Sequence, residues 1–412
     1  MKRMIAFIFS FLVVVSLAGC AGQQGSTLPT APAATIATPA TATPVESTPS
    51  PIQTTSAPVE TAAPVIKDGP IPGLLGEKWY DWDKVGAYPG SEVAAWGGRI
   101  AFQTIAKNGS NLFESHLSLA NTDGSDSKYT DILINSGDFL GLLKPSRMNY
   151  RDGWVYLIRS DNGKDHIYKV KEDGTSPIRL PTAEDTQYAE KEYFYDALLL
   201  INDKLYFTIE VEMGKVYHSV LARMNTDGSY EERLEESDSR YFSVLYYDAG
   251  KFYYECYDVN EDISELYQLD IATGASKPIG EIDTLDIKFV VRGDQAIFTE
   301  PYDSTNDNIC MVNVCSISSG KKETLIDANL DIIDYALFDR WLLMIDGFKG
   351  LLGYDFTTGK LYLLSDSPFI DNVQIAITAD QAYLQSIISG SLYPIQFANG
   401  KVTIGPNINE AK

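Results

Sequence analysis

The apolar positions from Glu77 onward fall into short runs of strand length, with no convincing long helical stretch among them. The stretch Trp154 to Leu180 shows this pattern clearly. It divides into three short runs, separated by an Asn-Gly turn at Asn162-Gly163 and an Asp-Gly turn at Asp173-Gly174. Both dipeptides supply the positive φ that tight hairpins require, so we predict a small antiparallel meander. Three short strands cannot bury both of their faces, and the meander therefore needs copies of itself.

Two markers of this meander recur along the chain. The first is an apolar-aromatic strand preceded by turn residues, and its copies begin at Arg99, Trp154, Lys204, Lys251, Gln295, Trp341 and Gln381. The second is a turn further along each copy, at Asp123-Gly124, Asp173-Gly174, Asp227-Gly228, Thr273-Gly274, Ser319-Gly320, Thr358-Gly359 and Asn399-Gly400. Successive copies lie about 40 to 55 residues apart, which is the period of four-stranded propeller blades.

These repeats predict an all-β fold, a β-propeller with seven four-stranded blades. Each blade packs both faces on its neighbours, which explains why strands such as Lys251 to Tyr254 are not cleanly alternating. Six blades are the alternative, should the weak copy from about Val373 to Ile404 not complete a blade. An irregular β-sandwich is the other interpretation. The aromatic segment Glu77 to Trp82 either adds a closing strand to the last blade or plugs one end of the channel.

The N-terminus has the pattern of a secretory signal. Two cations precede an apolar run from Ile5 to Val15 that is too short to span a membrane comfortably. The following Leu17-Ala18-Gly19-Cys20 resembles the lipobox of bacterial lipoproteins. That resemblance implies a mature N-terminus at Cys20, diacylglycerol on its sulfur, and durable anchoring by more than one acyl chain, such as palmitate. Cleavage near Ala18, with Cys20 unmodified, is the alternative.

Between this signal and the first strand the composition collapses to Thr, Pro, Ala and Ser. From Ser26 to about Val65 the sequence holds eight prolines and only two charges, Glu46 and Glu60. We predict a disordered stalk, which as polyproline II would reach on the order of 120 Å. The predicted organisation is a signal peptide over 1–19, a lipidated and disordered linker over 20–75, and a propeller over 76–412.

The net charge of the chain limits the classes of partner that it can bind. Its 412 residues carry 33 Lys and Arg against 56 Asp and Glu, a formal net charge of −23. A surface that binds nucleic acid needs a basic stripe, so nucleic acid is excluded as a partner. The same charge is repelled by an anionic membrane, so membrane contact requires the lipid anchor.

Some repeats share an apolar strand that ends in Asp-Gly-Ser or Asp-Gly-Thr and is followed by a short strand ending in Leu. The pattern occurs in Trp154–Leu180 and Leu205–Leu234, and its turn recurs at Asn121–Ser125. It resembles a bacterial propeller family of unknown function, related to the YWTD propellers of low-density-lipoprotein receptors. Later repeats have Thr-Gly or Ser-Gly, and no literal Tyr-Trp-Thr-Asp occurs. The resemblance implies a propeller with a binding role.

Candidate catalytic residues are few. The chain has three histidines, and His116 and His166 each lie eight residues before the turn glycine of their repeats. Equivalent positions on neighbouring blades would suit a ligand pair, but a site needs further partners, so we interpret both as polar residues near the start of a third strand. The third is His218. The motifs HExxH, GxSxG, GxxxxGK[ST] and CxxC do not occur.

One acidic loop has the spacing that opens a calcium site, at Asp258, Asn260 and Asp262. The glycine that an EF-hand requires at position six is Ile263, and the glutamate at position twelve is Leu269, so an EF-hand is excluded. A looser calcium site is the alternative to a solvated loop.

Three further features are interpreted without chemistry. Tyr302 to Asn308 is a solvated polar loop. Asp355 to Lys360 resembles a phrase of quinoprotein-type propellers, but Leu361 to Leu364 replace the tryptophan that follows it there, so we predict a turn. The internal cysteines are expected to be buried free thiols: Cys256, Cys310 and Cys315. We therefore predict no catalytic residue, metal site or cofactor.

The sequence thus indicates a non-enzymatic lipoprotein on the extracytoplasmic face of a bacterial membrane. Its monomeric propeller would bind a protein, peptide or glycan at one mouth. The alternative is a secreted propeller-type glycan hydrolase or lyase, which needs two channel carboxylates about 5 to 10 Å apart. An assembly accessory that works through edge pairing is a third hypothesis.

Overall fold

The computed structural model describes residues 65–78, 80, 84–85, 87–88, 93–108, 112–137, 147–161, 164–183, 187, 193–213, 216–282, 288–303, 306–366 and 373–408. All of them belong to one compact unit, 60–412. The predicted signal peptide, Cys20 and the linker up to residue 64 lie outside the described residues. Over the described ranges, no helix is long and apolar enough to cross a membrane.

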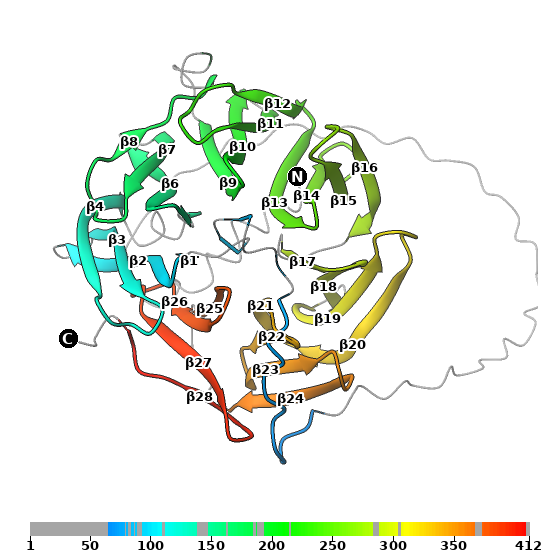
Figure 1. The fold of residues 1–412 in the computed structure, drawn as a ribbon. Coiled ribbons are helices and arrows are strands. Elements are labelled where there is room, and N and C mark those ends of the chain that lie inside the picture. The colour runs from blue at the N-terminus through cyan, green and yellow to red at the C-terminus, as the bar shows by residue number, and fades with distance from the viewer. Residues whose placement is uncertain are drawn as a thin grey trace, which may run out of the picture. The chain divides into compact units, whose positions relative to one another are not determined.

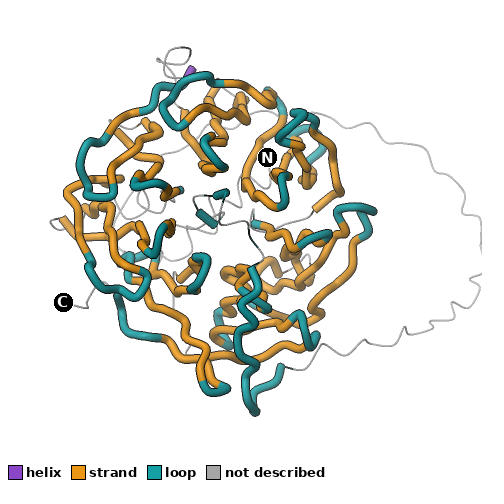
Figure 2. Tube along the Cα trace, in the orientation of Figure 1, coloured by secondary structure: helices purple, strands orange, loops and turns teal. Residues whose placement is uncertain are grey.

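The described strands form seven four-stranded antiparallel sheets arranged in a ring, a seven-bladed β-propeller (Figure 1, Figure 2). Blades one to three consist of β1 (Val93–Trp96), β2 (Arg99–Asn108), β3 (Leu112–Asn121), β4 (Lys128–Gly137), β5 (Asn149–Arg151), β6 (Trp154–Asp161), β7 (Lys164–Lys171), β8 (Ile178–Arg179), β9 (Tyr193–Ile201), β10 (Lys204–Met213), β11 (Val216–Asn225) and β12 (Glu232–Ser237). Blades four and five consist of β13 (Arg240–Asp248), β14 (Lys251–Asp258), β15 (Ile263–Asp270), β16 (Ser276–Ile282), β17 (Phe289–Arg292), β18 (Gln295–Asp303), β19 (Asn306–Ser316) and β20 (Lys322–Leu330). Blades six and seven consist of β21 (Ile332–Phe338), β22 (Trp341–Asp346), β23 (Gly350–Asp355), β24 (Lys360–Ser365), β25 (Val373–Ile377), β26 (Ala382–Ser386), β27 (Leu392–Ala398) and β28 (Lys401–Ile404).

Both repeat markers fall at equivalent places in all seven blades. The apolar-aromatic run is the second strand of its blade, and the recurrent turn joins the third strand to the fourth. The weak copy from Val373 to Ile404 forms a complete blade, β25 to β28. The prediction of seven blades is therefore confirmed, and the alternatives of six blades or a sandwich are excluded.

The Asp-Gly-Ser/Thr signature has a local physical cause. Gly124 has φ +82°, a backbone conformation that residues with a Cβ rarely adopt. The carboxylate of Asp123 accepts hydrogen bonds from the backbone N and the Oγ of Ser125 at 2.8 and 2.6 Å. The same pair of bonds closes the turns Asp173–Thr175 and Asp227–Ser229. The signature therefore encodes a turn of the fold.

The second strands are buried on both faces, as the two-sided apolar pattern predicted. In β22 the residues Trp341, Leu342 and Leu343 are all fully buried. The Trp341 ring stacks on Phe397 of blade seven at 5.9 Å and meets Tyr362 of its own blade at 5.6 Å. Packing between blades, rather than within one sheet, forms most of the core.

The antiparallel order gives each blade two distinct ends. Turns between strands one and two, and between strands three and four, lie on one side of the ring, which we call the turn face. Connections between strands two and three, and from blade to blade, lie on the opposite side, the loop face. The innermost strands β9, β13 and β21 carry bulges towards the loop face. Bulges re-aim side chains and are frequent beside functional sites.

The ring closes between blade seven and blade one without a shared strand, because each described sheet uses one continuous segment of chain. Tyr383 donates a hydrogen bond to the carbonyl of Thr122 at 2.8 Å, and Ile105 N donates to the carbonyl of Ser389 at 3.3 Å. Ile408, beyond the last strand, is buried in the same seam. Side chains and loops therefore perform the closure.

Candidate functional site

The described residues between 65 and 88 form a strap that crosses the turn face. Ile66 pairs with β24 of blade six through two backbone hydrogen bonds of 2.9 and 3.0 Å. Ile71 N then donates to the carbonyl of Gly400, in the last turn of blade seven, at 2.8 Å. The strap thus begins on the outer rim of the propeller.

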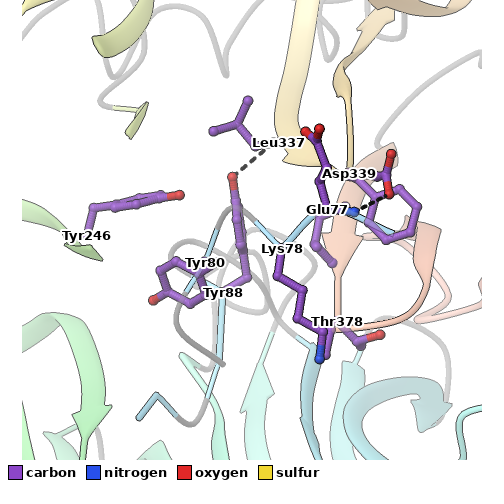
Figure 3. A pocket seen from close by; sticks show the side chains of 11 residues that line it. Glu77, Lys78, Tyr80, Tyr88, Tyr246, Leu337, Asp339 and Thr378 are labelled. Carbon is purple, nitrogen blue, oxygen red and sulfur yellow. Dashed lines mark hydrogen bonds between the residues drawn. The ribbon is translucent and has the colours of Figure 1, made fainter. Parts of the chain in front are cut away.

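A buried carboxylate turns the strap towards the channel. Asp339 lies in the first turn of blade six and accepts hydrogen bonds from Leu75 N at 2.8 Å and Glu77 N at 2.9 Å (Figure 3). A third bond comes from Arg340 N at 2.7 Å. Because the carboxylate is buried, these three donors hold it in a fixed orientation.

Three tyrosines then fill the axis of the ring. The rings of Tyr80, Tyr88 and Tyr246 meet edge to face, with centroids 5.2 to 5.9 Å apart (Figure 3). Leu337 N donates to the hydroxyl of Tyr88 at 3.0 Å. Burial raises the pKa of Tyr88 well above its ordinary value, so the hydroxyl is protonated near neutral pH.

The strap next reaches the opposite side of the ring. The carbonyl of Lys84 accepts from Asn202 N at 2.6 Å and from the guanidinium of Arg151 at 2.8 Å. Val85 bridges to β9, and Ala87 bridges to β1. The strap therefore occupies the turn-face mouth of the channel. Of the two predictions for Glu77 to Trp82, a plug is the one that its described residues support.

The loop-face half of the channel has polar walls. Lys288 forms an ion pair with Asp334 of the next blade, and the second oxygen of that carboxylate accepts from Ile375 N of the blade after it. Nearer the turn face, Asn149 is fully buried and bonds the backbone of β9 at Leu198 O and Leu200 N. Such side chains join the innermost strands of neighbouring blades.

Two carboxyl groups with raised pKa values lie on blade three towards the loop face, those of Asp196 and Glu210. Asp196 is the unpaired residue of the bulge in β9, and Arg147 Nε donates to its carbonyl at 3.0 Å. Burial raises the pKa of the Asp196 carboxyl, and the charge of Arg147 partly offsets this. Burial, together with the charge of Asp196, raises the pKa of Glu210 to about 8. Glu210 therefore keeps its proton near neutral pH.

This raised pKa predicts a pH-dependent stability. The folded protein holds the proton of Glu210 up to about pH 8, whereas the ordinary pKa of 4.5 applies to the unfolded chain. Stability from this group is full below 4.5 and is lost as the pH rises through about 8. Glutamine does not ionise, so replacing Glu210 by glutamine should stabilise the protein more near pH 8 than near pH 5. The expected difference is about 2 kcal/mol, a reduced value because Glu210 is partly exposed.

The measurement is urea unfolding across that pH range. Glu212→Gln is the matched control, since Glu212 is an exposed carboxylate two residues further along β10. A glutamine at 210 that changes stability equally at both pH values would contradict the assignment.

The loop face also presents one exposed aromatic side chain on a fixed loop. Phe348 lies between β22 and β23 and its residue is 83% exposed. The carboxylate of Asp346, fully buried, accepts from Phe348 N at 3.0 Å and Lys349 N at 2.7 Å. It also accepts from Asp331 N at 3.2 Å, which ties the loop to the entry of the blade.

The three histidines have separate polar partners. His116 Nε2 lies 3.3 Å from Glu114 Oε2, and His218 Nδ1 lies 2.8 Å from Asp238 Oδ1. His166 is buried, with Nδ1 3.3 Å from the hydroxyl of Tyr193. His116 and His166 lie in the third strands of their blades, as predicted. Among the described residues, no group of three or more His, Cys, Asp or Glu is placed to hold a metal ion.

The other candidate residues serve turns and core. Asp258 accepts from the backbone N of Asn260 at 2.9 Å, and Tyr257 donates to Asp262 at 2.7 Å, so these carboxylates bond within their own hairpin. Asp355 to Gly359 is a turn, closed by Gly359 N to Asp355 O at 2.8 Å. The internal cysteines are buried free thiols, as predicted: Cys256, Cys310 and Cys315.

The sequence did not single out Asp196, Glu210 or Phe348. A bulge shifts the inside-outside alternation by one residue, so the position of Asp196 has no periodic signal. Phe348 follows an Asp-Gly pair within an apolar stretch and reads as part of a strand pattern. The Asp-Gly pair itself was the signal that could have marked a loop tip.

These features place the chain in the class of β-propeller proteins. No family model matches it, and no curated protein does. An acylaminoacyl peptidase, solved in complex with Z-Gly-Gly-Phe-chloromethyl ketone, is similar over 80% of this chain and 53% of its own, with 11% identity and a TM-score of 0.51. The chain thus spans about half the length of that peptidase.

Two further solved structures are similar in part. The β-propeller domain of the Trilobed protease from Pyrococcus furiosus matches over 79% of this chain and 99% of its own, with 10% identity and a TM-score of 0.48. A chain of a nidogen/laminin complex matches over 63% and 91%, with 10% identity and a TM-score of 0.38. Likeness at these identities concerns the fold alone. The lipobox and the family of unknown function stay predictions.

Proposed function

We propose that the protein is a lipoprotein anchored at Cys20 on the extracytoplasmic face of a bacterial membrane, where its monomeric propeller binds a protein, peptide or glycan without catalysis. The observation that carries the binding role is the strap. Its residues occupy the turn-face mouth, and its first described residues lie on the turn-face side of the rim. A partner is therefore expected to bind at the loop face.

The anchor is tested at the lipobox. Replacing Cys20 by serine removes the sulfur that the acyl group requires, so the protein should move from the membrane fraction to the soluble fraction. Fractionation followed by immunoblotting measures this, with Ser26→Ala as a control that leaves the cysteine in place. Membrane retention of the Cys20→Ser protein, with unchanged acylation, would overturn the anchor.

The binding role is tested with the soluble Cys20→Ser protein as bait for detergent-solubilised cell envelope. We expect a discrete partner that excess free bait displaces. Equal retention by the heat-unfolded bait would contradict a role for the folded propeller.

The raised pKa of Glu210 favours one second function, a glycan hydrolase or lyase of propeller type. Such enzymes need one carboxyl that keeps its proton near neutral pH and protonates the departing sugar oxygen, and Glu210 beside Asp196 has that property. Turnover of a glycan by the wild type, lowered at least 100-fold by Glu210→Gln and by Asp196→Asn, would support it. Activity that both variants retain would exclude these residues.

A further inference from the structure

Phe348 lies at the surface in a loop whose conformation is fixed by hydrogen bonds. Besides the three backbone donors to Asp346, Lys349 Nζ donates to the same carboxylate at 3.2 Å and to the carbonyl of Asn329 at 2.9 Å. Gly347 N donates to the carbonyl of Asp331 at 2.9 Å. Because these bonds fix the loop before any contact, an aromatic side chain here loses little conformational freedom on binding.

Two partly exposed isoleucines lie on the same loop face as the Phe348 ring. Ile333, the residue displaced by the bulge of β21, is 41% exposed. Its Cδ1 lies 3.4 Å from the point that a Cβ on Gly347 would occupy, so its side chain adjoins the Phe348 loop. On the neighbouring blade, Ile388 in the equivalent loop is 39% exposed. An exposed aromatic beside aliphatic side chains is the composition of an interface centre.

The charges around this apolar surface are mostly negative. The exposed or partly exposed carboxylates on the two blade-to-blade connections that flank blade six are Asp331, before β21, and Asp366, after β24. The cation next to Phe348 in the chain, Lys349, is paired with the carboxylate of Asp346. An anionic membrane is repelled by such a face, whereas a basic polypeptide is attracted to it.

From these observations we propose that the Phe348 loop is the anchor of a docking surface for a basic protein segment, one that places an apolar side chain against Phe348 and Ile333 between flanking Lys or Arg residues. This inference rests on the proposed function and names the kind of partner and the contact residue. The apolar contact supplies the affinity, and the acidic loops supply orientation and a faster encounter at low salt.

The test is photo-crosslinking with the full, lipidated chain in living cells. The photoreactive residue p-benzoylphenylalanine is incorporated at Phe348 or, as the matched control, at Tyr230, which is 84% exposed on the turn face. We expect a discrete crosslinked protein from position 348 and none from 230, with the crosslink mapped by mass spectrometry to a Lys- or Arg-rich segment. A crosslink to lipid, to an acidic segment, or equally from both positions would overturn the proposal.

A second measurement uses a synthetic peptide of the crosslinked segment and the soluble Cys20→Ser protein. Adding Phe348→Ser should weaken binding about 10-fold or more, whereas adding Tyr230→Ser should leave it unchanged. Both side chains are exposed, so neither change should shift the melting temperature appreciably. A partner that binds the Phe348→Ser protein as tightly would refute this inference while leaving the proposed function intact. Failure of the folded propeller to retain any partner would refute both.

Discussion

Replacing Asp355 by alanine is expected to lower the free energy of unfolding by about 3 to 5 kcal/mol, because it strands a buried cation. Arg340 donates from Nε to Asp355 Oδ1 at 2.8 Å and from its terminal nitrogen to Oδ2 at 2.6 Å, and both side chains are buried. Thr357 N and Thr358 Oγ1 donate to the same carboxylate at 2.9 and 2.8 Å. The alanine variant would leave the guanidinium and the turn without their acceptor.

The matched control is Asp270→Ala. Asp270 ends the third strand of blade four, as Asp355 does in blade six, and it pairs with Lys251. Asp270 is far more exposed than Asp355, so Asp270→Ala should lower the free energy of unfolding much less than Asp355→Ala. Chemical denaturation of both variants measures the difference. Equal destabilisation by the two substitutions would contradict the role assigned to burial.

The pH dependence of Asp355 has a defined sign. Burial alone would raise its pKa, but the hydrogen bonds from Arg340, Thr358 and Thr357 outweigh this and lower the pKa. Stability from this carboxylate is therefore full above its ordinary value of 3.8 and is lost as the pH falls through the lowered folded value. The stability gap between the wild type and Asp355→Ala should narrow in acid.

Replacing Gly390 by alanine should open the seam between blades seven and one, at a cost of about 3 kcal/mol. Gly390 has φ +66°, and an added Cβ would stand 2.4 Å from the carbonyl oxygen of Gln103 and 2.7 Å from Cα of Thr104. Both atoms belong to backbone, so relief requires β2 to move away from the loop. The adjacent hydrogen bond from Ile105 N to Ser389 O would lengthen as well.

The control is Gly274→Ala, which isolates the backbone effect. Gly274 has φ +70°, but nothing lies within 4 Å of its added Cβ. It should cost about 1 kcal/mol, the usual penalty for a Cβ in the left-handed region. Differential scanning calorimetry of both variants provides the comparison. Equal losses of stability in the two variants would mean that the seam between blades seven and one accommodates the added methyl group.

Features of the fold that repeat were predictable, and features that occur once were not. Blade number followed from turns whose chemistry is local, as at Asp123-Gly124, where one carboxylate and one positive φ define the turn. The path of the strap followed from no such signal. Its bond from Leu337 N to the Tyr88 hydroxyl joins residues 249 positions apart, and no periodic pattern reports a contact of that range.

The features of the candidate site can also be separated into those that the sequence predicted and those that it did not. The turn at Asp355 and the buried thiols follow from residue type and context, and both were predicted. The coupling of Asp196 to Glu210 depends on a bulge, and the exposure of Phe348 depends on the carboxylate of Asp346 beneath its loop. Both are properties of packed neighbours, which the sequence pattern does not encode.

The strap also sets an order of events in folding. It precedes all seven blades in the chain, yet Asp339, which holds Leu75, lies 264 positions later. Such a contact closes a very long loop, and contacts of this kind form late. The strap is thus synthesised before the blades, and we expect it to dock after blades six and seven have formed. We expect the channel to be open at the turn face until then, so docking of the strap would mark the completed ring.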